Sequence, residues 1–98
     1  MSLPIVFLPE ARTEYDEAYD WYEAQSPGLG NAFGNRVEDV LKQVAATPEM
    51  HQMIHKDARR AVVRKFPYSV IYRLLPGQVL VIAIFHGKRN PKVWQERI

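Results

Sequence analysis

The stretch QVLVIAIFH, residues 78–86, decides how the rest of the chain can be arranged. Apolar side chains fill both alternating sets of positions, so neither side of a strand formed here is polar. The two sets are Val79, Val81, Ala83 and Phe85, and Leu80, Ile82 and Ile84. A strand that is apolar on both faces is buried on both sides. Residues 78–86 are therefore predicted to form a central strand with a neighbouring strand on each edge.

Two more strands are predicted before it, and one at the start of the chain. RRAVVRKF (59–66) and YSVIYRLL (68–75) show strand-like alternation, and they are separated by Pro67. A Pro-Gly turn at residues 76–77 then leads into the central strand, which predicts an antiparallel meander. The apolar run LPIVFL, residues 3–8, is the available neighbour for the other edge of the central strand.

Two helices are predicted between the first strand and the meander. Residues 29–46 carry an apolar stripe at helical spacing, and residues 10–25 carry apolar and aromatic side chains at the same spacing. In the first helix these are Ala11, Tyr15, Ala18, Trp21 and Tyr22. Ser-Pro-Gly at residues 26–28 separates the helices, and Thr47 before Pro48 ends the second, because a residue that precedes proline avoids helix. An antiparallel helix hairpin follows.

The elements together predict one α+β domain, residues 1–98, with the order β-α-α-β-β-β. The helix hairpin is expected on one face of a mainly antiparallel four-stranded sheet, and a short C-terminal helix or tail is expected after Pro91. Residues 49–57 carry no clear period. The buried residues are expected to include Phe33, Val37, Val40, Leu41, Val70, Val81 and Ile82.

The charge is divided unequally along the chain. Residues 1–49 contain three Lys or Arg and nine Asp or Glu, a balance of −6, whereas residues 50–98 contain ten and two, a balance of +8. A basic half of this kind favours contact with a polyanion or an acidic protein. The chain has no cysteine, which excludes disulfides and thiolate metal sites. With no apolar run near the roughly 20 residues that span a bilayer, and no signal-peptide pattern, we expect a cytoplasmic protein without membrane contact.

Basic residues gather where the central strand ends, in FHGKRNPKVW, residues 85–94. His86 continues the alternation of Leu80, Ile82 and Ile84, so it is expected at the rim of the core. Gly87 permits a turn, and cations follow at Lys88, Arg89 and Lys92. Further cations in the predicted strands would add to a cationic surface, since residues two apart share a face. They are Arg59, Arg60, Arg64, Lys65 and Arg73. A structural histidine and a solvated basic turn remain the simpler interpretations of the same residues.

The element order and two quoted segments, RRAVVRKFPYSVIYRL and VIAIFHGKRNPKVWQER, resemble the RelE/ParE superfamily of toxins from type II toxin-antitoxin modules. The resemblance covers essentially the whole chain and is closer to ParE-like members. It implies a plasmid-stabilization type of toxin with a cognate antitoxin protein as partner and no cofactor.

Two activities are compatible with this resemblance, and they leave open whether the chain is an enzyme. ParE-like members inhibit DNA gyrase and need only a basic interaction surface. RelE-like members are ribosome-dependent mRNA endoribonucleases, for which Arg64 and Arg89 would hold the phosphate and His86 would transfer protons. No tyrosine follows Tyr72, so the C-terminal tyrosine of RelE-like ribonucleases has no counterpart, and this favours the ParE-like alternative. The expected target-binding residues are Arg64, Lys65, Arg73, His86, Lys88, Arg89 and Lys92.

A third alternative is an inactive homologue that only binds its antitoxin. A metal site is not predicted, because His51 and His55 have the spacing of a helical metal site but lack the glutamate of HExxH. The remaining candidates for acid/base work are carboxylates of the first helix, and they are expected on its solvated side. They are Glu14, Asp16, Glu17, Asp20 and Glu23.

Overall fold

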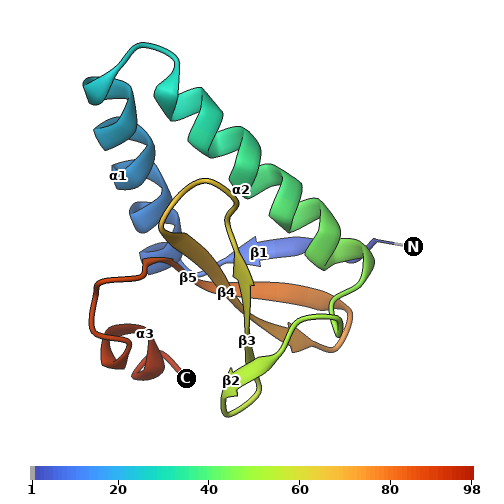
Figure 1. The fold of residues 1–98 in the computed structure, drawn as a ribbon. Helices are drawn as coiled ribbons and strands as arrows, with labels where there is room; N and C mark the ends of the chain where they lie inside the picture. The colour runs from blue at the N-terminus through green and yellow to red at the C-terminus, as the bar shows by residue number, and fades with distance from the viewer. Residues whose placement is uncertain (1) are drawn as a thin grey trace.

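The computed structural model describes residues 2–98, which form one mixed sheet with helices on both of its faces (Figure 1). The strand order is β1-β5-β4-β3-β2, and only the β1–β5 pair is parallel. The strands are β1 (Ile5–Phe7), β2 (Met53–His55), β3 (Ala58–Val62), β4 (Tyr68–Leu75) and β5 (Gln78–His86). The predicted central strand therefore lies between β1 and β4, as its two apolar faces require.

The helix hairpin consists of α1 (Pro9–Gln25) and α2 (Leu29–Ala46), which pack together on one face of the sheet (Figure 1). A short helix, α3 (Lys92–Gln95), follows β5 and brings Trp94 onto the opposite face. The α+β class and the arrangement of the hairpin are confirmed. None of the helices in residues 2–98 is long and apolar enough to cross a membrane.

The sheet has five strands, and the prediction of four was wrong in this detail. The additional strand, β2, lies in the stretch without a clear period and pairs with β3 through Met53 and His55. A three-residue strand at the edge of a sheet has one partner and shows too few alternations for a sequence pattern. The predicted strand 59–66 is consequently not at the edge of the sheet.

The same predicted strand also ends earlier than expected. β3 stops at Val62, and residues 63–67 form a turn that is closed by the hydrogen bond from Val63 N to Tyr68 O at 2.9 Å. Lys65 has a positive φ of 71°, which no residue of a regular strand adopts. Arg64 and Lys65 are thus exposed on a turn and do not belong to a sheet surface.

A β-bulge in β5 changes which side chains face the helices. Ile71 pairs with Ala83 and Tyr72 pairs with Val81, so Ile82 is an extra residue opposite β4. Val81 and Ile84 lie in the core under the helices, whereas Ile82 and Ala83 both lie in the core of the opposite face. The regular alternation expected for residues 78–86 therefore holds only up to the bulge.

The predicted core is confirmed with one adjustment. The buried members are Phe33, Val37, Val40, Val70, Val81 and Ile82, whereas Leu41 is only partly buried. The largest apolar contact on the opposite face is Trp94, which is 3% exposed and packs with Ile71, Ile82 and Phe85. Burial of an indole of this size holds the C-terminal segment against the sheet.

Gly30 allows the start of α2 to approach the end of α1. A Cβ atom at Gly30 would lie 2.9 Å from the carbonyl oxygen of Tyr19 and 2.9 Å from Glu23 Oε1. Glu23 uses this proximity to accept hydrogen bonds from the N–H groups of Gly28 and Gly30, which the first turn of a helix leaves without partners.

We expect Gly30→Ala to destabilise the domain by about 1–3 kcal/mol, because the backbone oxygen of Tyr19 cannot move without separating the two helices. Thermal unfolding followed by circular dichroism measures this loss. Gly87→Ala is the matched control, since its Cβ would meet only Pro67 O at 3.7 Å. Equal melting temperatures for the two variants would contradict the close helix contact.

Candidate functional site

Two turns meet at the end of the sheet where β4 begins and β5 ends. Tyr68 pairs with His86, and the N–H of Gly87 donates to the carbonyl of Pro67 at 2.8 Å. The turn that carries Arg64 and Lys65 is thereby fixed beside the turn that follows His86. The two turns come together because of the register in which β4 and β5 pair. The local sequence of either turn does not determine this proximity.

The two turns and the start of α3 present five exposed cations, which we call the basic end of the sheet. They are Arg64, Lys65, Lys88, Arg89 and Lys92. Among the described residues, Arg89 is the member of this group that has a carboxylate within 4.0 Å. The other four cations have no such ion pair and can meet an external anion without breaking one.

Arg73 does not belong to this group, contrary to the sequence prediction. It pairs with Leu80 near the other end of β4 and forms a salt bridge with Asp57 at 2.8 Å. The hydrogen bond from Arg73 and its charge lower the pKa of Asp57 from its ordinary value. Arg59 is also engaged, because it donates to the carbonyls of Glu49 and His51. Both guanidinium groups connect segments of the fold.

Glu14 of α1 binds two arginines from the C-terminal segment. Its carboxylate lies 3.1 Å from Arg89 Nη1 and 2.9 Å from Arg97 Nη1. The guanidinium of Arg89 also lies over the ring of Phe85, 4.7 Å from its centroid. Glu14 and Phe85 thus orient the Arg89 side chain from two sides. The side chain is still 47% exposed to solvent.

The same carboxylate completes the open edge of β5. β1 ends at Phe7, and beyond it the N–H of Ile84 donates to Glu14 while the carbonyl of Ile82 accepts from Arg97. The Glu14 and Arg97 side chains are only 9% and 12% exposed. The expectation that Glu14 lies on the solvated side of its helix was therefore wrong. Buried main-chain groups need partners, and here an ion pair takes the place of a strand.

His86 lies on the helix side of the sheet because of the bulge. Its Nδ1 accepts a hydrogen bond from the N–H of Lys88 at 3.0 Å, and its ring meets the ring of Tyr68 edge-on at 5.1 Å. When Nδ1 accepts, the proton of the neutral imidazole is on Nε2. In this arrangement Nε2 of His86 can donate a hydrogen bond to a ligand.

Tyr68 and Trp21 are site residues that the sequence reasoning missed. They line a cavity of about 430 Å³ on the helix side of His86, together with Tyr22 and Pro67. Trp21 is 59% exposed, although it recurs at the same helical spacing as the buried Ala11 and Ala18. Burial raises the pKa of Tyr68 above its ordinary value, so the phenol keeps its proton at neutral pH.

A second cavity lies on the opposite side of the sheet end. It has a volume of about 170 Å³, and its polar lining comes from Arg60, Ser69, His86 and Arg89. His86 and Arg89 thus border both faces. Two arginines and a hydroxyl-bearing serine lie beside an otherwise apolar lining from Ile54, Ile71, Phe85, Pro91 and Trp94.

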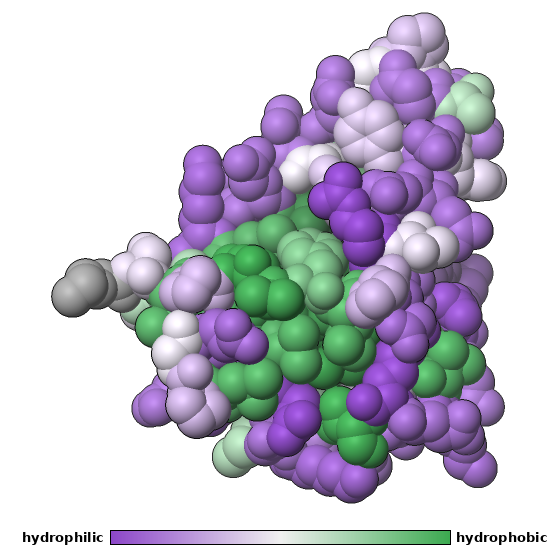
Figure 2. Space-filling model, turned by 180° about the vertical axis from the view of Figure 1, so that it is seen from behind, coloured by the Kyte–Doolittle hydropathy of each residue, from purple (hydrophilic) through white to green (hydrophobic). Residues whose placement is uncertain are grey.

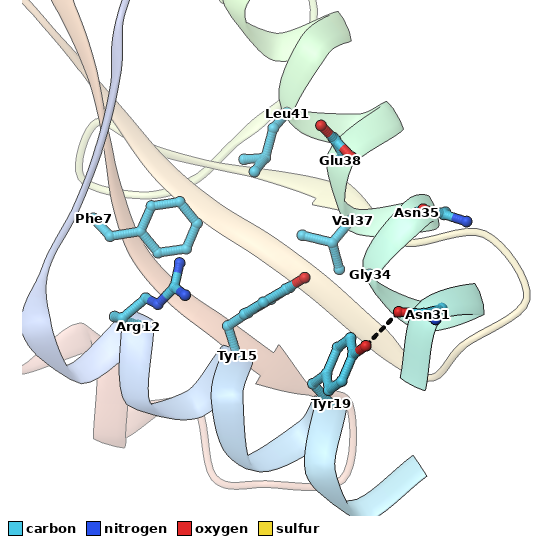
Figure 3. A pocket seen from close by; sticks show the side chains of 10 residues that line it. All are labelled: Phe7, Arg12, Tyr15, Tyr19, Asn31, Gly34, Asn35, Val37, Glu38 and Leu41. Atoms are coloured by element: carbon cyan, nitrogen blue, oxygen red, sulfur yellow. Dashed lines mark hydrogen bonds between the residues drawn. The ribbon is translucent and has the colours of Figure 1, made fainter. Parts of the chain in front are cut away.

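A third cavity, about 370 Å³, lies between α1 and α2 and contains none of the predicted site residues. In Figure 3 the Tyr15 ring crosses it with its hydroxyl toward Gly34, and Tyr19 donates a hydrogen bond to Asn31. Phe7 lies at the end of the cavity that faces β1 (Figure 3). Small residues on α2 leave this space between the helices.

Apolar side chains form a continuous surface over β1, below the two helices (Figure 2). We call this surface the β1 patch. Its members are Leu3, Ile5, Val6, Phe7, Leu8, Leu41 and Leu80, of which Val6 is 41% exposed. Hydrogen bonds from Val79 N to Pro4 O and from Leu8 N to Val81 O place the main chain of Ile5 and Phe7 on the outer edge of the sheet. The patch therefore combines apolar area with an unpaired strand edge.

His51 and His55 have separate partners. His51 Nδ1 lies 3.3 Å from the hydroxyl of the buried Tyr72, whereas His55 meets Trp94 edge-on. Among residues 2–98, no group of three or more His, Cys, Asp or Glu side chains is arranged to hold a metal ion. Burial, and then the charge of Arg59, lower the pKa of His51 from its ordinary value.

The lowered pKa of His51 predicts a loss of stability in mild acid. Since the folded pKa lies below the unfolded one, the unfolded chain binds more protons as the pH falls below about 6.5. The stabilisation is complete above that pH and is lost as the pH drops through the folded pKa. We expect His51→Gln to reduce the dependence of the melting temperature on pH between pH 6.5 and 5. Thermal scans across that range measure this dependence. Parallel curves for the variant and the parent would contradict the assignment.

Three comparisons place these features among known proteins. The sequence model of a family described as "ParE toxin of type II toxin-antitoxin system, parDE" matches residues 5–91. Toxin ParE2 from two strains of Mycobacterium tuberculosis is 26% identical over 83 residues, which cover 84% of this chain and 79% of the relative.

Two solved structures have the same fold. One, described as the chromosomal ParDE TA system from P. aeruginosa, has a TM-score of 0.75 at 13% identity and covers 87% of this chain and 96% of its own. The other is a mutant of the E. coli toxin RelE in the free state, with a TM-score of 0.75 at 18% identity, covering 100% and 99%. The family match spans most of the chain and includes β5 and the His86–Lys88–Arg89 turn. The chain therefore belongs to the ParE toxin family of type II toxin-antitoxin systems.

Proposed function

We propose that this ParE-type toxin arrests growth by inhibiting DNA gyrase, with the basic end of the sheet and His86 as the surface that contacts its target. The observation that carries this proposal is Arg89, an exposed guanidinium oriented by Glu14 and Phe85. The other four cations of the basic end form no ion pair within the described residues. A preoriented cation loses little freedom on binding an anionic or hydrogen-bonding partner.

The arrangement favours binding over catalysis. A general base requires a free lone pair near the proton that it removes. His86 has its Nδ1 engaged by Lys88, and the raised pKa of Tyr68 keeps that phenol from acting as a base at neutral pH. A gyrase inhibitor needs neither, because gyrase itself performs the DNA cleavage. A cytoplasmic site of action belongs to this proposal.

We assign the β1 patch to the cognate antitoxin. An extended segment can pair with the outer edge of β1 and place apolar side chains on Val6, Phe7 and Leu41, as in β-strand addition. Acidic residues of the same partner would extend toward the basic half of the toxin. Such a partner neutralises the toxin because it covers the basic end or keeps the basic end away from gyrase.

Two assays with purified gyrase, together with growth arrest in cells, test this proposal. We expect the toxin to block supercoiling by gyrase and to increase the amount of cleaved DNA held by the enzyme, and we expect added antitoxin to reverse both effects. Failure to affect gyrase, combined with growth arrest in cells, would refute the gyrase target. Absence of growth arrest with normal antitoxin binding would favour the inactive homologue.

The cavity lined by Arg60, Ser69, His86 and Arg89 favours a second candidate, an mRNA endoribonuclease of the RelE type. Tyr68 beside His86 also supplies the phenol that the sequence reasoning did not find near that histidine. Cleavage of ribosome-bound mRNA by the purified toxin, with loss of cleavage in His86→Ala, would replace the gyrase proposal with this one.

A further inference from the structure

The cavity on the helix side of His86 is walled by aromatic rings set at steep angles to one another. Trp21 and Tyr22 meet at 84° with their centroids 5.1 Å apart, and Tyr22 and Tyr68 meet at 67° and 6.2 Å. Tyr68 and His86 then meet at 81° and 5.1 Å. In each edge contact one ring covers a face of the other, and Tyr22 is also stacked on Phe33, so the open aromatic surface of this cavity is mainly the exposed ring of Trp21.

Trp21 has no role in the core that explains its place. Its side chain is 59% exposed at the cavity mouth, whereas Trp94, the other tryptophan, is 3% exposed. An exposed indole leaves a large apolar area in water and supplies a rigid stacking surface with few rotatable bonds. The cavity of about 430 Å³ is large enough for a flat heteroaromatic ring between Trp21 and Tyr68.

Cations surround one side of this aromatic cavity. Pro67 and His86 belong to its lining, and the turns that contain them carry Arg64, Lys65 and Lys88. The opposite side is formed by α1, where Glu17 lines the adjoining cavity with Ala18 and Trp21. Electrostatics therefore favour an anionic group of a ligand beside the basic turns and disfavour it beside α1. An uncharged ring can occupy the cavity between the turns and α1.

We propose that the Trp21–Tyr68 cavity binds one unstacked base of single-stranded DNA, while the flanking phosphates lie on the basic end of the sheet. A base can stack on the aromatic wall of the cavity, and its negatively charged phosphate can then lie over the cations of the neighbouring turns. Stacking on aromatic side chains beside a positively charged track is the usual means of binding single strands without reading their sequence. The choice of DNA over RNA rests on the proposed function, because gyrase acts on DNA.

The direct test is equilibrium binding of a fluorescent dT12 oligonucleotide to the purified toxin at low salt, followed by anisotropy. The matched probe is the same oligonucleotide with abasic sites in place of its central bases. We expect dT12 to bind on the order of tenfold more tightly than the abasic strand, because the abasic strand keeps the phosphates and loses the stacking. Equal binding of the two strands would overturn the proposal.

Substitutions locate the base on the protein. Trp21→Ala should weaken dT12 binding on the order of tenfold and leave the abasic strand unchanged, whereas Trp21→Phe should retain most of the affinity. Met50→Ala is the control, since Met50 is exposed to a similar degree and lies elsewhere. Lys88→Ala should lower the slope of log affinity against log salt by about one for both strands. An unchanged dT12 affinity in folded Trp21→Ala would overturn the base site.

Two further measurements separate the possible ligands and the two proposals. An rU12 strand that binds more tightly than dT12 would overturn the choice of DNA. The oligonucleotide assay contains no gyrase, so failure of base binding leaves gyrase inhibition to be judged by its own assay. Base binding without gyrase inhibition would support the cavity as a base-binding site but would remove the reason for choosing DNA. The comparison of rU12 with dT12 then decides between RNA and DNA.

Discussion

We expect Arg89→Ala to abolish growth arrest and to raise the toxin concentration needed for half-inhibition of gyrase on the order of 30-fold or more. The reason is that truncating a charged group at the centre of an interface costs 2 kcal/mol or more and leaves its partner groups unpaired. Supercoiling assays with titrated toxin measure the shift. The fold should persist, because Arg97 continues to pair with Glu14 in this variant.

The matched control for this prediction is Arg73→Ala. Arg73 was predicted to bind the target, but it pairs with Asp57 away from the basic end, and we expect its removal to leave inhibition within about twofold. Antitoxin binding by Arg89→Ala should be largely retained, because the β1 patch, which we assign as the main antitoxin contact, does not include Arg89. Full inhibition by Arg89→Ala would refute the assignment of the target surface.

Glu14→Ala should produce the largest loss of stability of any single substitution discussed for this chain. It leaves Arg97 charged and nearly buried without its partner, and it removes the acceptor of the Ile84 N–H. Breaking one side of a buried ion pair costs about 3–5 kcal/mol. For a domain of 98 residues this corresponds to a fall in melting temperature of roughly 12 °C or more.

Two comparisons make this prediction specific. Asp16→Ala breaks an exposed ion pair with Arg12 on the same helix and should change stability by less than about 0.5 kcal/mol. The double variant Glu14→Leu with Arg97→Met should be more stable than Glu14→Ala, because no unpaired charge remains buried. A melting temperature for Glu14→Ala close to that of Asp16→Ala would contradict the edge-completing role of Glu14.

Much of the fold was predictable from local patterns. The bounds of α2 and β5 agree with the sequence prediction at both ends, because Thr47-Pro48 and Pro76-Gly77 are strong breakers and both segments are long and regular. β2 was not predictable, since three residues with one partner show no usable period. Arg64 and Lys65 continued the alternation of β3, and the turn hydrogen bond from Val63 to Tyr68 and the positive φ of Lys65 show that the strand has already ended.

The candidate site was predicted in part. Lys88, Arg89, Lys92, Arg64 and Lys65 are exposed on adjoining turns as a cationic group, although their contact with a target stays a prediction. For Arg73 the contact with a target also stays a prediction, and residue type alone could not show that Asp57 lies 2.8 Å away. Trp21 was only noted as part of the helical spacing of its helix, and helical spacing does not reveal where the covering sheet ends.

The sequence by itself determined the order of the elements, the helix hairpin, the central position of residues 78–86 and the concentration of positive charge in the second half. These properties follow from periods, breakers and charges that act over a few residues. Only the tertiary structure decided which way His86 points, because a bulge in a strand with two apolar faces leaves no trace in its hydropathy. Only the tertiary structure decided that Glu14 binds Arg89 and Arg97, which are 75 and 83 residues away along the chain. These ion pairs form where β1 ends at Phe7 and leaves the edge of β5 unpaired. The Glu14 carboxylate and the Arg97 guanidinium supply the missing main-chain partners at that edge.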